Sequence, residues 1–125
     1  MYRALIVDDD QGMRRMVERV LTSQFEVETA QDGLEAIRRL RSSRFDVILL
    51  DLMMPGLSGF AVLEFLLKEQ IEIIGRVVVM TSRRVGEESR ICNHDFTARI
   101  LHKPFKESEL KTMVEKVIKG KADSR

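Results

Sequence analysis

The sequence lacks the features of a secreted, membrane or nucleic-acid-binding protein. Its single cysteine, Cys92, excludes an internal disulfide framework and is typical of a reducing compartment, so we expect a cytoplasmic protein. Its 21 basic and 20 acidic residues give a formal net charge of +1, whereas nucleic-acid-binding domains usually have a strong basic excess. The longest apolar runs, such as residues 4–7 and 47–50, fall far short of the ~20 residues that span a bilayer. We therefore expect a small soluble domain with no direct contact to nucleic acid or membrane.

The sequence does contain enough apolar material for one folded domain. The 125 residues are 44% hydrophobic and 33% charged, which excludes a disordered chain and leaves little room for a second domain. Short aliphatic and β-branched runs predict five strands, at residues 4–7, 25–30, 45–50, 77–80 and 99–102. The first, third and fourth are continuously apolar, as in strands covered on both faces of a parallel sheet. The second alternates and the fifth is short, so we expect these two at the sheet edges.

Helical patterns lie between the predicted strands. Apolar residues recur at spacings of three and four, which predicts helices over residues 13–21, 34–40, 60–67 and 110–118. A weaker, short or mobile helix is expected within residues 86–95. Strands that alternate with helices predict right-handed crossovers and a parallel sheet with helices on both faces, an α/β fold.

Polar residues mark the expected helix ends. Asp10 and Asp32 are predicted N-caps, and Glu35, three residues after Asp32, completes a capping box. Ser58 is a further candidate cap. Gly120 is expected to end the last helix.

Charged and hydroxyl residues follow four of the predicted strands, and together they indicate one functional site. In an open α/β sheet, the carboxyl ends of the strands meet at the edge where ligands bind. If strands one, three, four and five are neighbours, that edge gathers Asp8, Asp9, Asp10, Asp51, Thr81, Ser82, Lys103 and Pro104.

Such a group of acids requires a compensating cation. Two carboxylates ~4 Å apart repel by about 4 kcal/mol at an effective dielectric near 20. Lys103 neutralises one acid, and oxygen ligands without a His or Cys cluster favour Mg²⁺ over Zn²⁺ for the others. Because Mg²⁺ commonly shares a phosphate oxygen, the pattern indicates phosphoryl transfer. Asp51 is then the candidate nucleophile, Lys103 the neutralising cation and Thr81 a hydrogen-bond donor.

Four sequence pieces resemble the receiver domain of bacterial two-component response regulators, the CheY-like superfamily. They are residues 5–10 (LIVDDD), 46–56 (DVILLDLMMPG), 78–82 (VVMTS) and 103–105 (KPF), and the resemblance covers about residues 3–119. It implies a flavodoxin-like (βα)5 fold with strand order 2-1-3-4-5. It also implies a receiver domain at 1–120, followed at 121–125 by a polar tail or the start of a linker. The chain is either a complete single-domain regulator or the receiver of a longer protein.

The resemblance implies a role for each matching residue. Asp51 matches the phospho-acceptor, which takes a phosphoryl group from the phosphohistidine of a sensor histidine kinase or phosphotransfer protein, after which the domain switches conformation. Thr81 matches the hydroxyl that follows the phosphate. Lys103 matches the lysine of the family and precedes Pro104, whose peptide bond is commonly cis there. Such a protein promotes its own phosphorylation and dephosphorylation and is not a conventional enzyme.

The resemblance also implies a metal site for Mg²⁺ or Mn²⁺. Asp9 and Asp51 match direct ligands, and Asp8 matches a residue that acts mainly through water. The backbone carbonyl of Met53 matches the third protein ligand.

The sequence departs from the family at several positions, and we consider Met53, Ser82, Arg83 and Ile100 candidate modulators. Many receivers carry Tyr or Phe where this chain has Ile100, so the signal must pass without that ring. The Met53 side chain cannot hydrogen-bond a hydrolytic water, which predicts slow self-dephosphorylation. The fourth helix, fifth strand and fifth helix are the expected face for a homodimer or an output partner, and this face is altered here.

Two alternatives remain open from the sequence. A degenerate receiver would bind partners without phosphorylation, which the polar fourth helix and Ile100 favour. Intact site residues disfavour it, namely Asp9, Asp51, Thr81 and Lys103. A dehalogenase-like phosphatase also uses an Asp after a strand, but it requires a second Asp where this chain has Met53.

Overall fold

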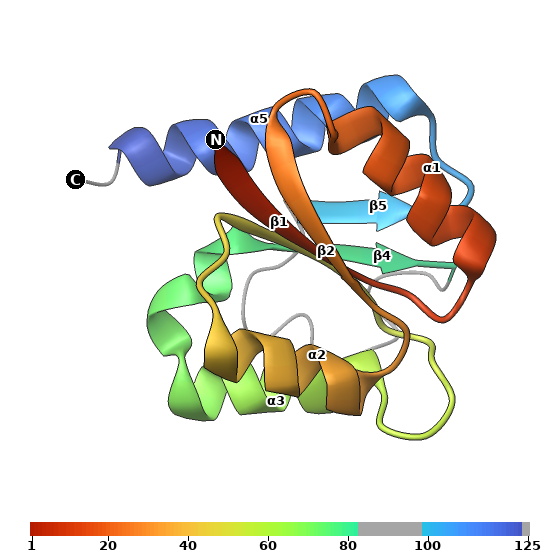
Figure 1. Cartoon of the computed structure of the whole chain (residues 1–125), viewed down its shortest axis with the longest axis vertical. Helices are drawn as coiled ribbons and strands as arrows, with labels where there is room; N and C mark the ends of the chain where they lie inside the picture. The colour runs from red at the N-terminus through yellow and green to blue at the C-terminus, as the bar shows by residue number, and fades with distance from the viewer. Residues whose placement is uncertain (83–98, 124–125) are drawn as a thin grey trace.

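The computed structural model describes residues 1–82 and 99–123 and contains a five-stranded parallel sheet (Figure 1). Its order is β2-β1-β3-β4-β5, and each pair of neighbours is parallel. This order confirms the predicted 2-1-3-4-5 arrangement and its two edge strands. The strands are β1 (Tyr2–Val7), β2 (Phe25–Ala30), β3 (Val47–Asp51), β4 (Val77–Thr81) and β5 (Ile100–His102).

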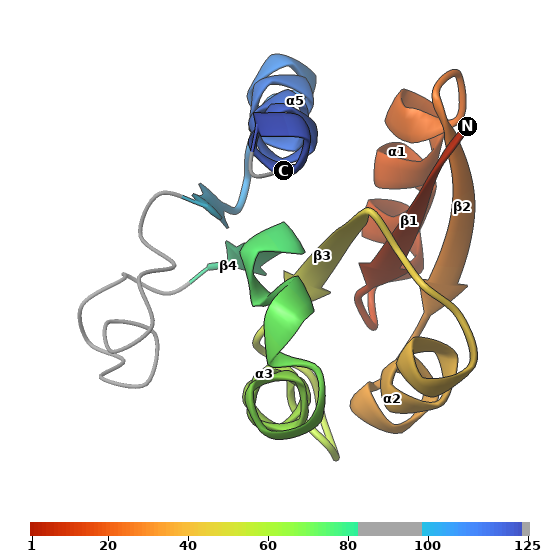
Figure 2. The same ribbon diagram turned by 90° about the vertical axis from the view of Figure 1, so that its left-hand side faces the viewer.

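Helices cover both faces of the sheet (Figure 2). On one face lie α1 (Gln11–Leu21) and α5 (Glu107–Asp123), and on the other lie α2 (Gly33–Ser42) and α3 (Gly59–Glu69). A 3-10 helix that no sequence pattern indicated, η1 (Ile71–Arg76), connects α3 to β4. The helix expected within residues 86–95 lies outside the described residues.

The core consists of two apolar layers separated by the sheet. Leu5 and Val7 of β1 pack toward α2 and α3, whereas Ala4 and Ile6 pack toward α1 and α5. Because successive side chains of a strand point to opposite faces, a strand in this position needs apolar residues throughout. β3 and β4 are likewise buried at every position. The continuous apolar runs therefore form the central strands, as predicted.

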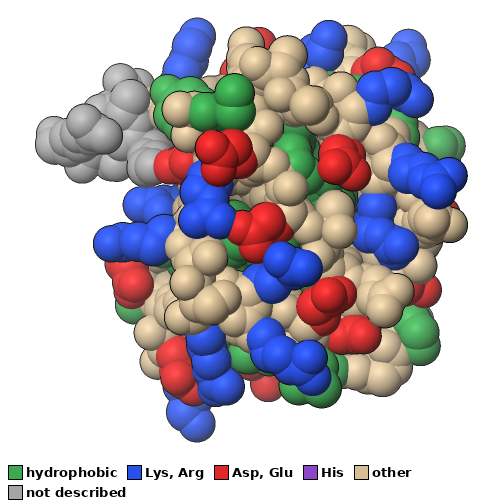
Figure 3. All heavy atoms as spheres, viewed as in Figure 1, with side chains coloured by type: hydrophobic (Ala, Val, Ile, Leu, Met, Phe, Trp, Pro, Cys, Tyr) green, Lys and Arg blue, Asp and Glu red, His purple; other side chains and the backbone are tan. Residues whose placement is uncertain are grey.

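The surface carries charges of both signs. Basic and acidic side chains are interspersed over the face in Figure 3, in keeping with a formal net charge of +1. Within residues 1–82 and 99–123, no helix is long and apolar enough to cross a membrane.

The predicted N-caps are confirmed for two helices and incomplete for a third. Asp10 accepts hydrogen bonds from the backbone at the start of α1, and Asp32 accepts one from Glu35 N at 2.8 Å. The Glu35 carboxylate, however, accepts from Gln31 N at 2.8 Å instead of from Asp32 N, so the capping box is displaced by one residue. Ser58 occupies the N-cap position of α3 but makes no side-chain capping bond.

The last helix is longer than predicted. The expectation that Gly120 ends it is wrong, because α5 continues to Asp123. A glycine costs a helix interior about 1 kcal/mol, which is not enough to stop a helix by itself. Gly120 has no positive φ angle, the backbone conformation that would make it a terminator.

Candidate functional site

The carboxyl edge of the sheet gathers the predicted site residues. Val7 is in register with Leu50 across β1 and β3, so Asp8 and Asp51 come level at the ends of these strands. Thr81, in register with His102, ends β4, and Lys103 follows β5. Asp8, Asp51 and Thr81 are also the buried polar residues of the part that the structure describes. The fold therefore places buried polar groups at this edge.

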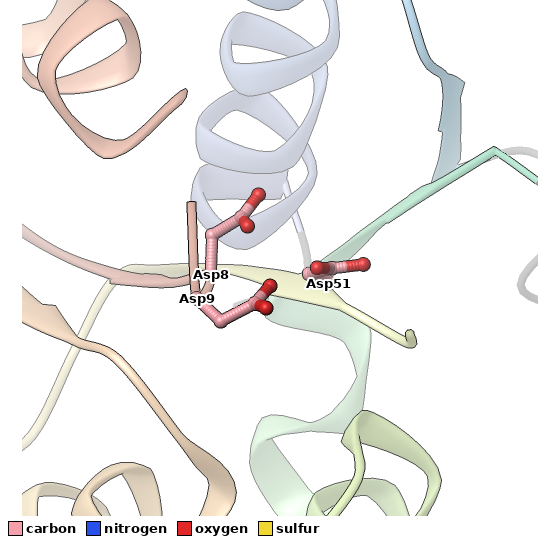
Figure 4. A group of neighbouring side chains, drawn as sticks. All are labelled: Asp8, Asp9 and Asp51. Carbon is pink, nitrogen blue, oxygen red and sulfur yellow. The ribbon is translucent and has the colours of Figure 1, made fainter. Parts of the chain in front are cut away.

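Three carboxylates lie together at the centre of this edge (Figure 4). Asp8, Asp9 and Asp51 each offer one oxygen, and these oxygens lie within 4.8 Å of one another. Asp8 and Asp51 are buried, whereas Asp9 is exposed. The chain thus concentrates negative charge where water has little access, which is costly unless positive charge lies nearby.

Lys103 supplies part of that positive charge. Its Nζ lies 2.7 Å from Asp8 Oδ2, to which it donates a hydrogen bond, and 3.5 Å from Asp51 Oδ2. The backbone N–H of Lys103 donates to the Thr81 carbonyl at 2.9 Å, which attaches the start of the β5–α5 loop to β4. The Lys103–Pro104 peptide bond is cis, as expected. One ammonium group therefore contacts both buried acids.

Asp8 is held in place by backbone and side-chain bonds. Asp8 Oδ1 accepts from Asp10 N at 3.0 Å, and Asp8 N donates to the Ala30 carbonyl at 3.1 Å. Arg14 Nη1 donates to the Asp8 carbonyl oxygen at 2.7 Å. Arg14 was not among the predicted site residues, although its place in the first turn of a helix that follows three aspartates was a usable signal. These bonds fix the end of β1, so the Asp8 carboxylate needs little ordering when a ligand arrives.

Asp51 is fixed by the loop that follows it and by the start of α3. Met53 N donates to Asp51 Oδ1 at 3.0 Å. Gly59 begins α3, and a Cβ at this position would lie 2.2 Å from the Asp51 carbonyl oxygen. Only a residue without a side chain lets α3 come this close to β3.

The ionisation of the site reflects its excess of negative charge. Burial and the charge of Asp8 raise the pKa of Asp51 from 3.8 to about 6, although the Met53 hydrogen bond and the Lys103 charge act in the opposite direction. Burial alone would lower the pKa of Lys103, but the hydrogen bond to Asp8 and the charges of Asp8 and Asp51 outweigh it, so this pKa is raised. At neutral pH the lysine is charged and Asp51 is mostly ionised.

The donor set fits a hard divalent cation. Three carboxylates face one ammonium group, and their oxygens lie close enough to share an ion. Oxygen donors of this kind suit Mg²⁺ or Mn²⁺ better than Zn²⁺. The residues present therefore match the predicted cofactor, and the Met53 carbonyl stays a predicted ligand.

The candidate modulators are distributed around the site. The Met53 side chain is 40% exposed, and Ser82 is exposed just after β4. Ile100 is half-buried against the α2/α3 apolar layer. Arg83 lies outside the described residues.

Known response regulators have sequences similar to that of this chain. A model of the response regulator receiver domain matches residues 4–115. The transcriptional regulatory protein CpxR homolog of Haemophilus influenzae is 34% identical over 98% of this chain and 52% of its own length. Response regulator MprA of Mycobacterium is 37% identical over 86% of this chain and 46% of its own length. The chain thus spans about half the length of the curated relatives it matches.

Solved structures lead to the same family. The chemotaxis protein CheY4 of Vibrio cholerae has a TM-score of 0.83 at 31% identity, over 94% of this chain and 98% of its own. The response regulator TrrA of Thermotoga maritima, solved in complex with Mg(2+)-BeF, has a TM-score of 0.79 at 28% identity, over 94% of this chain and 99% of its own. The fold, the acidic edge and these relatives agree that the chain belongs to the response regulator receiver domain family.

Proposed function

We propose that Asp51 is the phospho-acceptor of a two-component signalling system. The observation that carries this proposal is the contact of one lysine with two buried acids: Lys103 Nζ lies 2.7 Å from Asp8 and 3.5 Å from Asp51. A surface ion pair would not need buried carboxylates, and a structural pair would not need two acids per lysine. The arrangement suits a site that gains negatively charged oxygens during its reaction.

The proposed reaction transfers a phosphoryl group from a phosphohistidine. One Asp51 oxygen attacks phosphorus, the N–P bond of the donor breaks, and its electron pair stays on the imidazole, which takes a proton. The products are an aspartyl phosphate and a neutral histidine. Lys103 neutralises charge on the phosphoryl oxygens, and Thr81 donates a hydrogen bond to one of them. Because the pKa of Asp51 is about 6, most of this carboxylate is ready to attack at neutral pH.

Asp8, Asp9, Asp51 and the Met53 carbonyl are the residues that would hold Mg²⁺ or Mn²⁺. The Thermotoga maritima relative in complex with Mg(2+)-BeF supports this assignment. When bound, the ion supplies further neutralisation of the phosphoryl oxygens.

The donor that we propose is a sensor histidine kinase or phosphotransfer protein in the cytoplasm. Response regulator receiver domains take phosphoryl groups from histidine kinases, and they are signalling domains rather than conventional enzymes. We further propose that residues 1–120 form the receiver and that residues 121–125, the first three of which continue α5, form a tail or the start of a linker. The face formed by the predicted fourth helix, β5 and α5 stays our candidate for a homodimer or an output partner.

Intact-mass measurement tests the assignment of Asp51. Wild type, Asp51→Ala and Asp46→Ala are incubated with acetyl phosphate and Mg²⁺, with EDTA samples in parallel. Asp46 is a matched control because it precedes the same strand at its other end. We expect one phosphoryl group on wild type and Asp46→Ala, and none on Asp51→Ala or in EDTA. An unchanged wild-type mass would contradict the proposal and favour a receiver that only binds partners.

A further inference from the structure

Exposed apolar side chains gather beside the acidic site. Among residues 1–82 and 99–123, six large hydrophobic side chains are strongly exposed. Two of them lie in the β3–α3 loop that follows Asp51, and a third lies in the turn of α2 that is hydrogen-bonded to this loop. Leu34 is 53% exposed in the first turn of α2, and Met53 and Leu57 are each 40% exposed in the β3–α3 loop. Single exposed apolar residues are ordinary, but a group at one place indicates a contact surface. We call Leu34, Met53 and Leu57 the rim patch.

A tight backbone contact joins the two segments that carry the rim patch. Gly33 N donates to the Leu57 carbonyl oxygen at 3.2 Å, and a Cβ on Gly33 would lie 2.3 Å from that oxygen. Figure 1 shows the start of α2 beside the loop that precedes α3. Leu34 is the next residue after Gly33, so the contact brings Leu34 and Leu57 to one place. The fold thus presents them as a fixed surface.

The same loop is attached to the reacting carboxylate. Met53 N donates to Asp51 Oδ1 at 3.0 Å, so the rim patch begins two residues from Asp51. Asp51 itself is only 2% exposed. A protein donor must therefore cover the surroundings of the opening to bring an imidazole onto this carboxylate.

The acidic edge alone offers such a donor little binding energy. Desolvating its carboxylates is costly, whereas apolar side chains that become buried favour association. In protein interfaces a few apolar or aromatic contacts carry most of the affinity. Of the exposed apolar side chains that the structure describes, those of the rim patch lie in and beside the loop that follows Asp51, where they can make these contacts.

We propose that the rim patch is a docking surface for the protein that carries the phosphohistidine, which covers it with apolar side chains of its own. This inference rests on the function proposed above for Asp51. It predicts that Leu34 and Leu57 serve transfer from a protein donor and leave transfer from a small donor unaffected.

The rates of phosphoryl transfer from a protein donor and from a small-molecule donor distinguish a role in docking from a role in the reaction itself. The double variant Leu34→Gln with Leu57→Gln is compared with wild type and with Ile71→Gln. Ile71 is a matched control, 62% exposed at the start of η1, before β4 and away from its carboxyl end. Met53 is left unchanged because its backbone belongs to the site. The probes are acetyl phosphate and the ³²P-labelled histidine kinase core that phosphorylates wild type fastest in a panel of such kinases. Thermal unfolding of each variant checks that it is folded.

We expect the double variant to accept phosphoryl groups from the kinase at least about tenfold more slowly than wild type, at limiting kinase. Its rate with acetyl phosphate should stay within about twofold, and Ile71→Gln should match wild type with both donors. An unchanged kinase rate in the double variant would overturn the docking surface. So would an equal loss with both donors, or an equal loss in Ile71→Gln. Failure of wild type itself to react with acetyl phosphate would instead contradict the proposed role of Asp51.

Discussion

Two charged regions of the molecule balance their charges differently. Within residues 1–82 and 99–123, three carboxylates, those of Asp8, Asp9 and Asp51, lie together at the carboxyl edge, and the ammonium group of Lys103 contacts two of them, Asp8 and Asp51. Against α2, Glu28 of β2 accepts hydrogen bonds from Arg3 and Arg39, and Arg39 also lies 3.7 Å from Glu35. We call Arg3, Glu28, Glu35 and Arg39 the Glu28 cluster. It holds two positive and two negative groups, whereas the carboxyl edge holds an excess of negative charge.

This comparison distinguishes charges that stabilise the fold, as in the Glu28 cluster, from charges that are available for a reaction, as at the carboxyl edge. Partial burial of Glu28 is compensated by two guanidinium groups. Asp51 is almost fully buried and shares the ammonium group of Lys103 with Asp8, so burial and the charge of Asp8 raise its pKa to about 6. The ionised form of Asp51 therefore lowers the free energy of unfolding at neutral pH. A bound cation, or a modification that neutralises the carboxylate, reduces this cost.

The largest expected effect comes from removing the ammonium group of Lys103, which contacts both buried acids of the carboxyl edge. Lys103→Ala takes away the group that neutralises charge on the transferred phosphoryl group. Loss of a comparable charge-stabilising donor slows reactions by about 100- to 1000-fold. We expect a decrease of this size in the rate of phosphorylation by acetyl phosphate, followed by intact mass over time.

Lys106→Ala is the control for that experiment, because Lys106 is exposed and close in sequence. It should react like wild type. A Lys103→Ala rate within about threefold of wild type would mean that the charge imbalance at this edge has no role in the reaction.

The next effect concerns stability and its dependence on pH. Between pH 3.8 and about 6 the folded protein binds more protons at Asp51 than the unfolded chain does, so stability falls as pH rises through this window. The full difference corresponds to about 3 kcal/mol at most. We expect metal-free Asp51→Asn to be more stable than wild type at pH 7.5, with the difference shrinking toward pH 4.5. Urea unfolding at several pH values measures it.

Asp46→Asn tests whether the loss of any acidic side chain stabilises the protein at pH 7.5. Asp46 Oδ2 accepts from Arg3 N at 2.8 Å, so neutralising it removes a compensated charge and should not stabilise the protein. Mg²⁺ should stabilise wild type more than Asp51→Asn. Equal pH profiles for wild type and Asp51→Asn would show that burial of Asp51 costs nothing.

The central strands and the site could be predicted because both follow from short local patterns. Continuous apolar runs identified the central strands, and parallel strands bring their carboxyl ends to one edge, so Asp8, Asp51 and Lys103 had to lie close together. The resemblance supplied the order of the strands, which periodicity alone leaves open.

Features that depend on tertiary contacts could not be predicted in the same way. The bond from Arg14 to the Asp8 carbonyl and the bonds of Glu28 to Arg3 and Arg39 join residues whose proximity only the fold determines. The end of α5 was missed for another reason. A glycine near a helix terminus stops the helix only where its backbone turns left-handed, and Gly120 does not.

A smaller effect is expected at Met53, on the lifetime of the phosphorylated form. Its thioether cannot orient a water for attack on the phosphoryl group, so the partner-free aspartyl phosphate should last much longer than seconds. Met53→Gln offers an amide at this exposed position and should shorten the lifetime by about three- to tenfold. Loss of the phosphorylated mass after removal of acetyl phosphate measures it. Leu57→Gln, which changes another exposed side chain of the same loop, is the control, and wild-type loss within seconds would contradict the prediction.

The smallest effect, a change in stability, is expected in the Glu28 cluster. Glu28→Gln keeps the shape of the side chain but leaves Arg3 and Arg39 without its negative charge. Because the Glu28 side chain is 26% exposed, water screens part of the loss, and we expect the free energy of unfolding to fall by about 1–2 kcal/mol. Glu26→Gln, exposed on the same strand, should change it by less than about 0.5 kcal/mol. Removing an acid would then destabilise the protein at Glu28 and stabilise it at Asp51. If Glu28→Gln were as stable as wild type in urea unfolding at pH 7.5, compensation by the two arginines could not explain why the two regions differ.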